Sequence, residues 1–140
     1  MILILIGNIE EGVAFINALN KRNFNNLIIA VQQVASSTFD GLKITEVIDF
    51  KNVPTWENIN VEELEFVFDL TDNLTIAQQQ WEYCIENQVP IIHLCDNEDF
   101  KNWTEDQNKS PFYWSLLKRG DDPSSIYAEI MSRMLVRNFA

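Results

Sequence analysis

The chain begins with a run of hydrophobic residues, Met1–Ile6, that ends at Gly7 and leads into a helical pattern. Val13, Ile16 and Leu19 recur at the spacing of one helix face. A strand that is buried on both faces appears in a sequence as such an uninterrupted hydrophobic run. The order of strand, glycine turn and helix predicts the opening of a βαβ unit.

Further short hydrophobic segments, each bounded by polar or turn-forming residues, predict more strands. They span residues 27–31, 42–50, 65–70 and 91–94. Two amphipathic patterns predict helices at 76–87, where Thr75 is the expected N-cap, and at 124–138. The polar, acidic stretch 96–109 predicts a loop, and the aromatic stretch 112–117 predicts a turn of helix.

Alternating strands and helices predict one domain over residues 1–140, a three-layer Rossmann-like α/β fold. The parallel sheet is expected to have about five strands in the order 3-2-1-4-5, with helices on both faces. Ligands of such sheets bind in the crevice outside the carboxyl ends of strands 1 and 4. The alternative is a flavodoxin-like or receiver-like domain, with the order 2-1-3-4-5. A receiver needs an acidic pair directly after its first strand, and Glu10 and Glu11 lie too far into the helix.

The chain is strongly acidic, with 10 Lys and Arg against 21 Asp and Glu, a net charge of −11 and a pI near 4.3. This balance argues against binding to nucleic acid or to anionic membranes, which both require a basic surface. The hydrophobic start is too short to cross a membrane and has no basic flank or cleavage site, so we expect a cytoplasmic protein. Cys84 and Cys95 form no metal or redox motif, and we expect buried free thiols.

Residues 18–21, 27–31 and 81–94 carry a family resemblance in their order and spacing. With these segments the chain resembles the extended short-chain dehydrogenase/reductase family, and most of all its nucleotide-sugar epimerases and dehydratases of the heptose-epimerase type. The resemblance covers nearly the whole chain, but only the cofactor-binding half of such an enzyme. It implies a domain related to those that hold NAD or NADP, without the sugar-binding part.

The resemblance and the strand-order rule together indicate candidate cofactor-binding positions at the first turn and at two later strand ends. They are Gly7, Asn8, Ile9, Gly12, Asp49, Phe50, Leu70 and Thr71. The three glycines of the family motif align with Ile6, Ile9 and Gly12, so only the glycine that lets the helix pack on the sheet is present. An isoleucine at position 9 would place a side chain where the backbone must approach pyrophosphate. The pair Asp49-Phe50 matches the family's acidic and apolar residues beside the adenine.

The start of the first helix also has a simpler interpretation from the residues themselves. Glu10 and Glu11 place negative charge at a helix N-terminus that should receive a phosphate. Asn8 can cap this helix, and Glu11 at the third position would complete a capping box. We therefore favour a helix that fills its own anion site over one that binds phosphate.

The catalytic positions implied by the resemblance are altered as well. Asp96 stands where the family has a serine or threonine. Tyr127 keeps the family's tyrosine, but Met131 replaces the lysine that lowers the pKa of the phenol. Tyr113 and Lys118 are five residues apart instead of four, which turns the lysine away from the tyrosine. These positions are therefore expected to be vestigial.

His93, the one histidine, lies in a hydrophobic strand, and no carboxylate or serine is placed near it in the sequence so as to make a triad, so we expect a satisfied core residue. We interpret the chain as a catalytically degenerate epimerase-like domain that acts as a binding or assembly module, with no cofactor and no metal. The alternative is an active NAD(P)-dependent nucleotide-sugar epimerase or reductase with a nonstandard phosphate loop. Two hydrophobic rows on the last helix predict a homodimer through residues 76–87 and 124–138.

Overall fold

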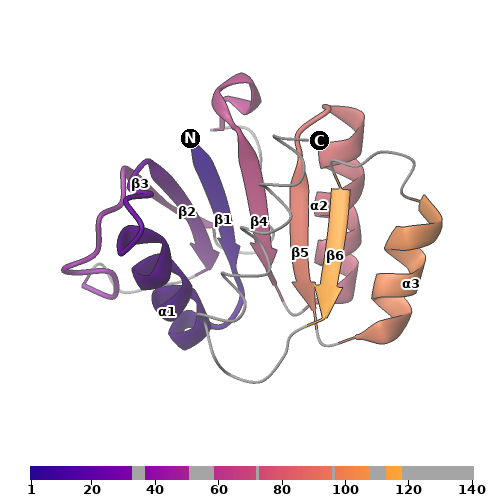
Figure 1. Ribbon diagram of the computed structural model, residues 1–140, viewed down its shortest axis with the longest axis horizontal. Helices are drawn as coiled ribbons and strands as arrows, with labels where there is room; N and C mark the ends of the chain where they lie inside the picture. The colour runs from indigo at the N-terminus through magenta and orange to yellow at the C-terminus, as the bar shows by residue number, and fades with distance from the viewer. Residues whose placement is uncertain (33–36, 51–58, 72, 96, 108–112, 118–140) are drawn as a thin grey trace.

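A computed structural model describes residues 1–32, 37–50, 59–71, 73–95, 97–107 and 113–117 of the chain. A six-stranded sheet runs in the order β3, β2, β1, β4, β5, β6, and every neighbouring pair is parallel (Figure 1). The strands are β1 (Ile2–Ile6), β2 (Leu27–Gln32), β3 (Glu46–Phe50), β4 (Phe66–Leu70), β5 (Ile91–Cys95) and β6 (Tyr113–Leu117). The helices are α1 (Ile9–Asn20), α2 (Leu74–Glu86) and α3 (Glu98–Gln107), with a short 3₁₀ helix, η1 (Val61–Glu63). The predicted Rossmann-like fold and the order of its first five strands are confirmed.

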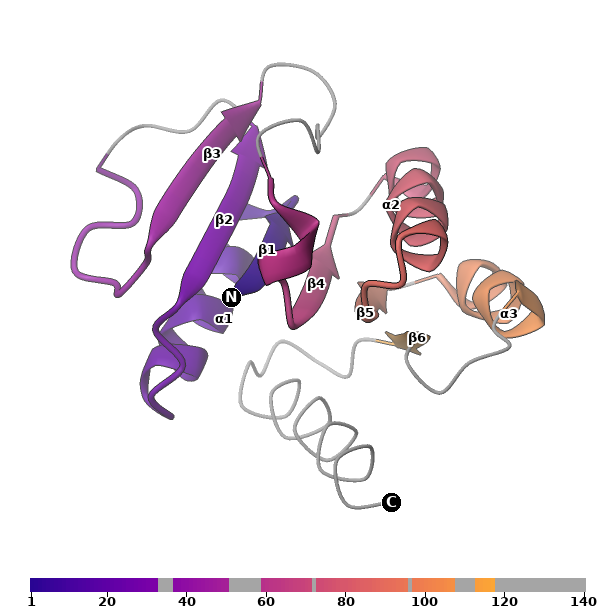
Figure 2. The ribbon, with the colours of Figure 1, turned by 90° about the horizontal axis from the view of Figure 1, so that it is seen from above.

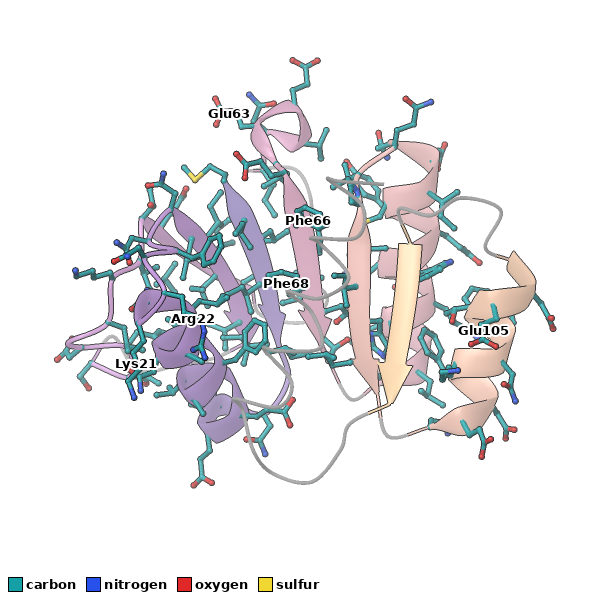
Figure 3. The ribbon with its side chains drawn as sticks, in the orientation of Figure 1. Lys21, Arg22, Glu63, Phe66, Phe68 and Glu105 are labelled. Carbon is teal, nitrogen blue, oxygen red and sulfur yellow. The ribbon has the colours of Figure 1, made fainter. Side chains whose placement is uncertain are left out.

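The two central strands, β1 and β4, are buried along their whole length. Side chains alternate between the faces of a strand, so Ile4 and Phe68 face one side of the sheet and Leu3 and Val67 face the other. Figure 3 shows Phe66 and Phe68 on β4, and their rings are 6.2 Å apart in a stacked arrangement. The uninterrupted hydrophobic runs of the sequence therefore reflect burial on both faces.

The described helices cover the sheet from two sides, with α1 on one face and α2 and α3 together on the other (Figure 2). On the α1 side, Phe15 and Ile16 pack among the side chains of β1, β2 and β4. On the other side, Trp81 and Cys84 of α2 pack on Leu3, Leu5 and further side chains of the sheet. The described residues thus form a hydrophobic core on each face of the sheet.

The helix α3 lies where the sequence predicted a loop. Asn97 caps this helix, because its Oδ1 accepts a hydrogen bond of 2.8 Å from the backbone N–H of Phe100. Glu98 and Asp99 in the first turn interact favourably with the helix dipole. Phe100 and Trp103, one turn apart, anchor the helix on the sheet. The loop prediction failed because a helix with so few hydrophobic positions lacks the continuous stripe that the pattern analysis required.

Two further elements differ from the prediction, one in its type and one in its first residue. Residues 113–117 form β6, which pairs with β5 from Ile91↔Tyr113 onward, instead of a turn of helix. A short hydrophobic run does not distinguish strand from helix by its periodicity.

The helix α2 begins at Leu74, two residues before the expected first residue, because Asn73 and not Thr75 is its N-cap. Asn73 Oδ1 accepts a hydrogen bond of 3.1 Å from Ile76 N.

Candidate functional site at the carboxyl edge of the sheet

The carboxyl ends of β1 and β4 lie side by side at the point where the strand order reverses. The two strands pair in register up to Ile6↔Leu70, so the residues that follow, Gly7 and Thr71, leave the sheet at the same edge. Asp49 and Phe50 close β3 at this edge, but β2 lies between β3 and β1. The first turn and the end of β4 are therefore brought together, and the end of β3 is not.

The turn from β1 to α1 is organised by the cap of the helix. Asn8 has an extended backbone, and its Oδ1 accepts a hydrogen bond of 3.0 Å from Glu11 N. Its backbone carbonyl accepts a bond of 2.9 Å from Gly12 N. Glu10 and Glu11 occupy the first turn. The predicted capping role of Asn8 is confirmed, and an acceptor of the protein itself satisfies one of the donors that a phosphate would use.

Gly12 is needed for the contact between helix and strand. A Cβ atom at this position would lie 2.7 Å from both Cδ1 and Cγ2 of Ile6. Ile6 is buried toward α1, and Ile9 packs in part against the same core. The isoleucine at position 9 therefore turns toward the protein core. Gly7 and Asn8 stay exposed at the edge.

Beyond β4, the donors of Thr71 are used inside the protein. Its backbone N–H and its hydroxyl both donate to Asp69 Oδ1, at 2.9 and 2.6 Å. Thr71 is buried, and Leu70 before it is completely buried toward the α1 side. This double hydrogen bond fixes the exit of the chain from β4.

Asp69 also meets His93 across the strand pair β4 and β5. The two residues are register partners, and His93 Nδ1 lies 2.9 Å from Asp69 Oδ2, a short polar contact whose angle departs from that of a hydrogen bond. Their side chains are 0% and 1% exposed. Phe100 of α3 covers the imidazole, with the ring centres 4.5 Å apart. Within the described residues His93 Nε2 has no hydrogen-bond partner, so the expectation of a fully satisfied histidine is wrong at this atom.

The sequence analysis missed this pair because it searched for a carboxylate near His93 along the chain. The available signal was that two hydrophobic strands, predicted to be neighbours, each carry one charged or imidazole side chain inside the strand, Asp69 and His93. In a parallel pair the partners are far apart in sequence and adjacent in space. A comparison of the polar positions of neighbouring strands would have found Asp69.

Cys84 of α2 lies on the same side of the sheet. Burial raises the pKa of the Cys84 thiol above its ordinary value near 9.0, and the Asp69 carboxylate raises it further. A thiol held in its neutral form is a poor nucleophile and a poor metal ligand. The prediction of a buried free thiol is confirmed for Cys84, and the side chain of Cys95 lies outside the described part of the chain.

Several predicted positions cannot be placed. Asp96, Tyr127, Met131 and the helix 124–138 lie outside the described residues, so the homodimer through 76–87 and 124–138 stays a prediction. Among the residues that the structure describes, no group of His, Cys, Asp or Glu has the arrangement of a metal site. None of the described helices has the length and hydrophobicity to cross a bilayer.

The parallel sheet, its strand order and the edge formed by β1 and β4 define a Rossmann-like α/β domain. No protein-family model matches the chain, and no curated protein does. Among solved structures it is similar to the molybdenum cofactor carrier protein MCP from Chlamydomonas reinhardtii, with a TM-score of 0.50 and 7% sequence identity. The similarity covers 93% of this chain and 98% of the other. At this identity it concerns the fold alone.

The resemblance to the extended short-chain dehydrogenase/reductase family is therefore wrong. The similar structure is a carrier protein of a different fold family, and no family model supports an epimerase. The order of strand, glycine turn and helix misled the analysis because any parallel βαβ unit produces it. The NAD or NADP site and the interpretation of Asp96, Tyr127 and Met131 as vestigial catalytic positions lose their basis with the family.

Proposed function

We propose that this chain is a ligand-binding module that holds a polar small molecule over the carboxyl edge of β1 and β4 and does not convert it. The site would consist of the exposed turn Gly7–Asn8 beside the end of β4, where the buried Thr71 fixes the exit of the chain from the sheet. Two considerations support this placement. In open parallel sheets, ligands bind outside the carboxyl ends of the strands where the order reverses. The structural neighbour, at the level of the fold, is described as a carrier protein.

The proposal that the ligand is not converted rests on the burial of the Asp69–His93 pair. Asp69 and His93 are completely buried, and Thr71 beside them is nearly so. A general acid or base must come within hydrogen-bond distance of its substrate. Groups this deep contact only the protein, so they are suited to fixing the shape of the edge.

The electrostatics of the turn define the class of ligand. Asn8 already accepts from the start of α1, and Glu10 and Glu11 carry negative charge there. The chain as a whole carries −11, so a phosphate would meet repulsion at long and at short range. The edge therefore favours an uncharged or cationic polar ligand, and disfavours NAD, NADP and ADP.

Amide NMR spectra of the isotope-labelled protein test the proposal. The protein is titrated with pooled small molecules sorted by charge, and with the molybdenum cofactor, NAD, NADP and ADP as the anionic arm. We expect ligands of the uncharged or cationic pools to shift the amides of Gly7, Asn8 and Thr71, and the ligands of the anionic arm to leave them in place.

Matched variants separate the edge from the rest of the surface. Asn8→Asp keeps a capping acceptor and adds charge at the turn. Asn60→Asp makes the same change on the cap of η1, which precedes β4 and therefore lies at the amino-terminal ends of the strands. Asn8→Asp should alter binding, and Asn60→Asp should not. Low-micromolar binding of a dinucleotide, chemical conversion of a ligand, or shifts confined to another surface would each contradict the proposal.

A further inference from the structure

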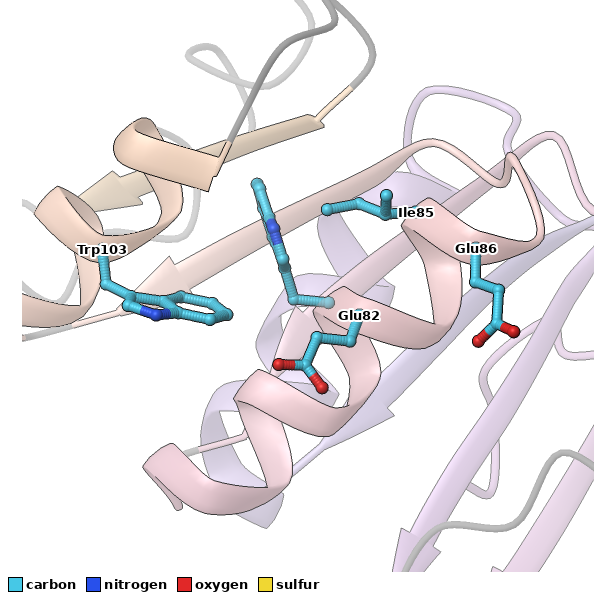
Figure 4. A pocket seen from close by; sticks show the side chains of 5 residues that line it. Glu82, Ile85, Glu86 and Trp103 are labelled. Atoms are coloured by element: carbon cyan, nitrogen blue, oxygen red, sulfur yellow. The ribbon is translucent and has the colours of Figure 1, made fainter.

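A groove separates the carboxyl-terminal half of α2 from α3. Its volume is about 220 Å³, and it is lined by Trp81, Glu82, Ile85, Glu86 and Trp103. Figure 4 shows Trp103 reaching from α3 toward α2, where Glu82 and Glu86 stand on successive turns. Trp81 is buried, whereas Trp103 is half-buried and both glutamates are exposed. The groove thus has an aromatic and aliphatic lining with two carboxylates at its rim.

Neither carboxylate forms an ion pair in the described part of the chain. Besides the buried contact of His93 with Asp69, the ion pairs found there join the amino terminus to Glu65 and Lys101 to Glu105, and none involves the rim of the groove. Glu82 and Glu86 are four residues apart on one helix face, a spacing at which like charges repel. A cation bound between them would relieve this repulsion.

The wall opposite the carboxylates is held in place by packing. The rings of Trp103 and Phe100 are 5.7 Å apart, and Phe100 in turn lies against His93. An indole is the best aromatic partner for a cation, and an arginine guanidinium can stack on it while donating hydrogen bonds to a carboxylate. The lining therefore offers both kinds of contact that a guanidinium makes.

We propose that this groove binds an arginine side chain of a basic segment on a partner protein. The guanidinium stacks on Trp103 and pairs with Glu82 and Glu86, and its methylene stem lies along Ile85. The net charge of −11 attracts basic segments at long range, which raises their rate of encounter. The groove lies at the carboxyl-terminal half of α2, and the ligand edge lies where α2 begins. The inference is thus independent of the proposed ligand site.

The test is an NMR titration of the full chain with a capped glycine–arginine–glycine peptide. The signals to follow are the Trp103 indole N–H, assigned with Trp103→Phe, and the amides of Glu82 and Glu86. We expect the arginine peptide to shift these signals. A citrulline peptide, which has the same shape without the charge, should leave them in place. A lysine peptide should bind more weakly, because its ammonium cannot stack or form a two-point contact.

Charge-matched variants distinguish a site from general attraction. Glu82→Gln should weaken binding about two- to fivefold, the range expected for an exposed ion pair. Glu63→Gln removes the same charge from η1, outside the groove (Figure 3), and should leave the affinity unchanged. Equal binding of the citrulline or lysine peptide overturns the assignment. So does an equal loss in both variants, or a set of shifts that maps away from the groove.

Discussion

The central strands β1 and β4 are buried on both faces of the sheet, but the two faces are built differently. Toward α1 the interior is hydrophobic throughout, with side chains from β1, β2 and β4 packed on Phe15, Ile16 and Leu19. Toward α2 and α3 the interior also contains polar groups. All the buried polar side chains found in the described residues belong to this side: Asp69, Thr71, Gln80, His93 and Thr104.

The difference shows how each face specifies its geometry. Hydrophobic packing holds α1 on the sheet, and its close approach depends on Gly12. At the end of this helix, Asn20 exchanges hydrogen bonds with the backbone of Lys43. On the other face a buried polar group is costly unless it is paired, so the contacts of Asp69 with Thr71 and His93 select one arrangement of β4 and β5. Because Phe100 packs on the imidazole, the polar pair also helps to position α3.

The largest expected effect comes from removing the carboxylate at the centre of the polar face. Asp69→Ala should lower the free energy of unfolding by about 3–5 kcal/mol, because several buried polar groups lose their acceptor at once. Asp69→Leu, which refills the volume, should stay similarly destabilised. Asp69→Asn should recover part of the loss, because its amide oxygen can still accept from Thr71. Urea denaturation monitored by tryptophan fluorescence measures all three.

The neighbouring residue on the opposite face provides the matched control. Leu70→Ala should cost about 2–5 kcal/mol by leaving a cavity. Leu70→Met nearly conserves the volume and should cost less than about 1.5 kcal/mol. If Asp69→Leu were tolerated as well as Leu70→Met, the polar face would be no more specific than the hydrophobic one, and the comparison would fail.

The strands and their order could be predicted because burial on both faces leaves a direct trace in the sequence. Each central strand is a short, nearly continuous hydrophobic run, and right-handed crossovers leave few possible orders. The elements at the edge of the sheet were harder to predict. The helix α3 has two hydrophobic anchors, Phe100 and Trp103, among charged residues, and β6 is too short for its periodicity to be decisive.

The candidate site was predictable in its location and not in its chemistry. The strand-order rule places Gly7 and Thr71 at one edge, and the structure brings them together. The family assignment failed because a glycine turn follows from the geometry of a parallel unit. The Asp69–His93 pair depends on the register between two strands, which hydrophobic patterning specifies only through the side chains of each face.

The second prediction addresses packing on the α1 face. Gly12→Ala should cost about 1–3 kcal/mol, because its Cβ would meet Ile6 in a filled core. The higher helix propensity of alanine offsets about 1 kcal/mol of this. In an Ile6→Ala background the obstructing atoms are gone, so Gly12→Ala should become neutral or stabilising.

The control for this reversal is a change in the same strand toward the other face. Leu5 is buried toward α2, and Leu5→Ala leaves the contact between Gly12 and Ile6 intact. Gly12→Ala should therefore remain destabilising in the Leu5→Ala background. Urea unfolding of the two double variants decides this, and a reversal of sign in both would mean that Ile6 is not the obstacle.

The third prediction concerns the pH dependence of the α2 face. Because the pKa of Cys84 is raised in the folded state, its thiol stays neutral there while the unfolded thiol ionises above its ordinary value near 9.0. The contribution of Cys84 to stability is complete below this pH and falls above it, by about 1.4 kcal/mol per pH unit. Unfolding free energies of the wild type and of Cys84→Ala, compared between neutral and alkaline pH, should converge. A constant difference would show that the thiol ionises equally in both states.

The smallest effect compares the caps of the two helices on opposite faces. Asn8 and Asn73 make the same contact, each accepting from the backbone N–H three residues later, at 3.0 and 3.1 Å. Asn8→Ala and Asn73→Ala should therefore each cost about 1 kcal/mol, and the two losses should add to within about 0.5 kcal/mol because the helices pack in separate cores. Replacement by serine keeps an acceptor and should restore most of the stability in either helix.

The first turn of α1 carries Glu10 and Glu11, whereas that of α2 carries no acidic residue. Added salt screens the interaction of such charges with the helix dipole. Thermal unfolding of Asn73→Ala should therefore respond less to salt than that of Asn8→Ala, in which the two carboxylates are the remaining stabilisers of the helix start.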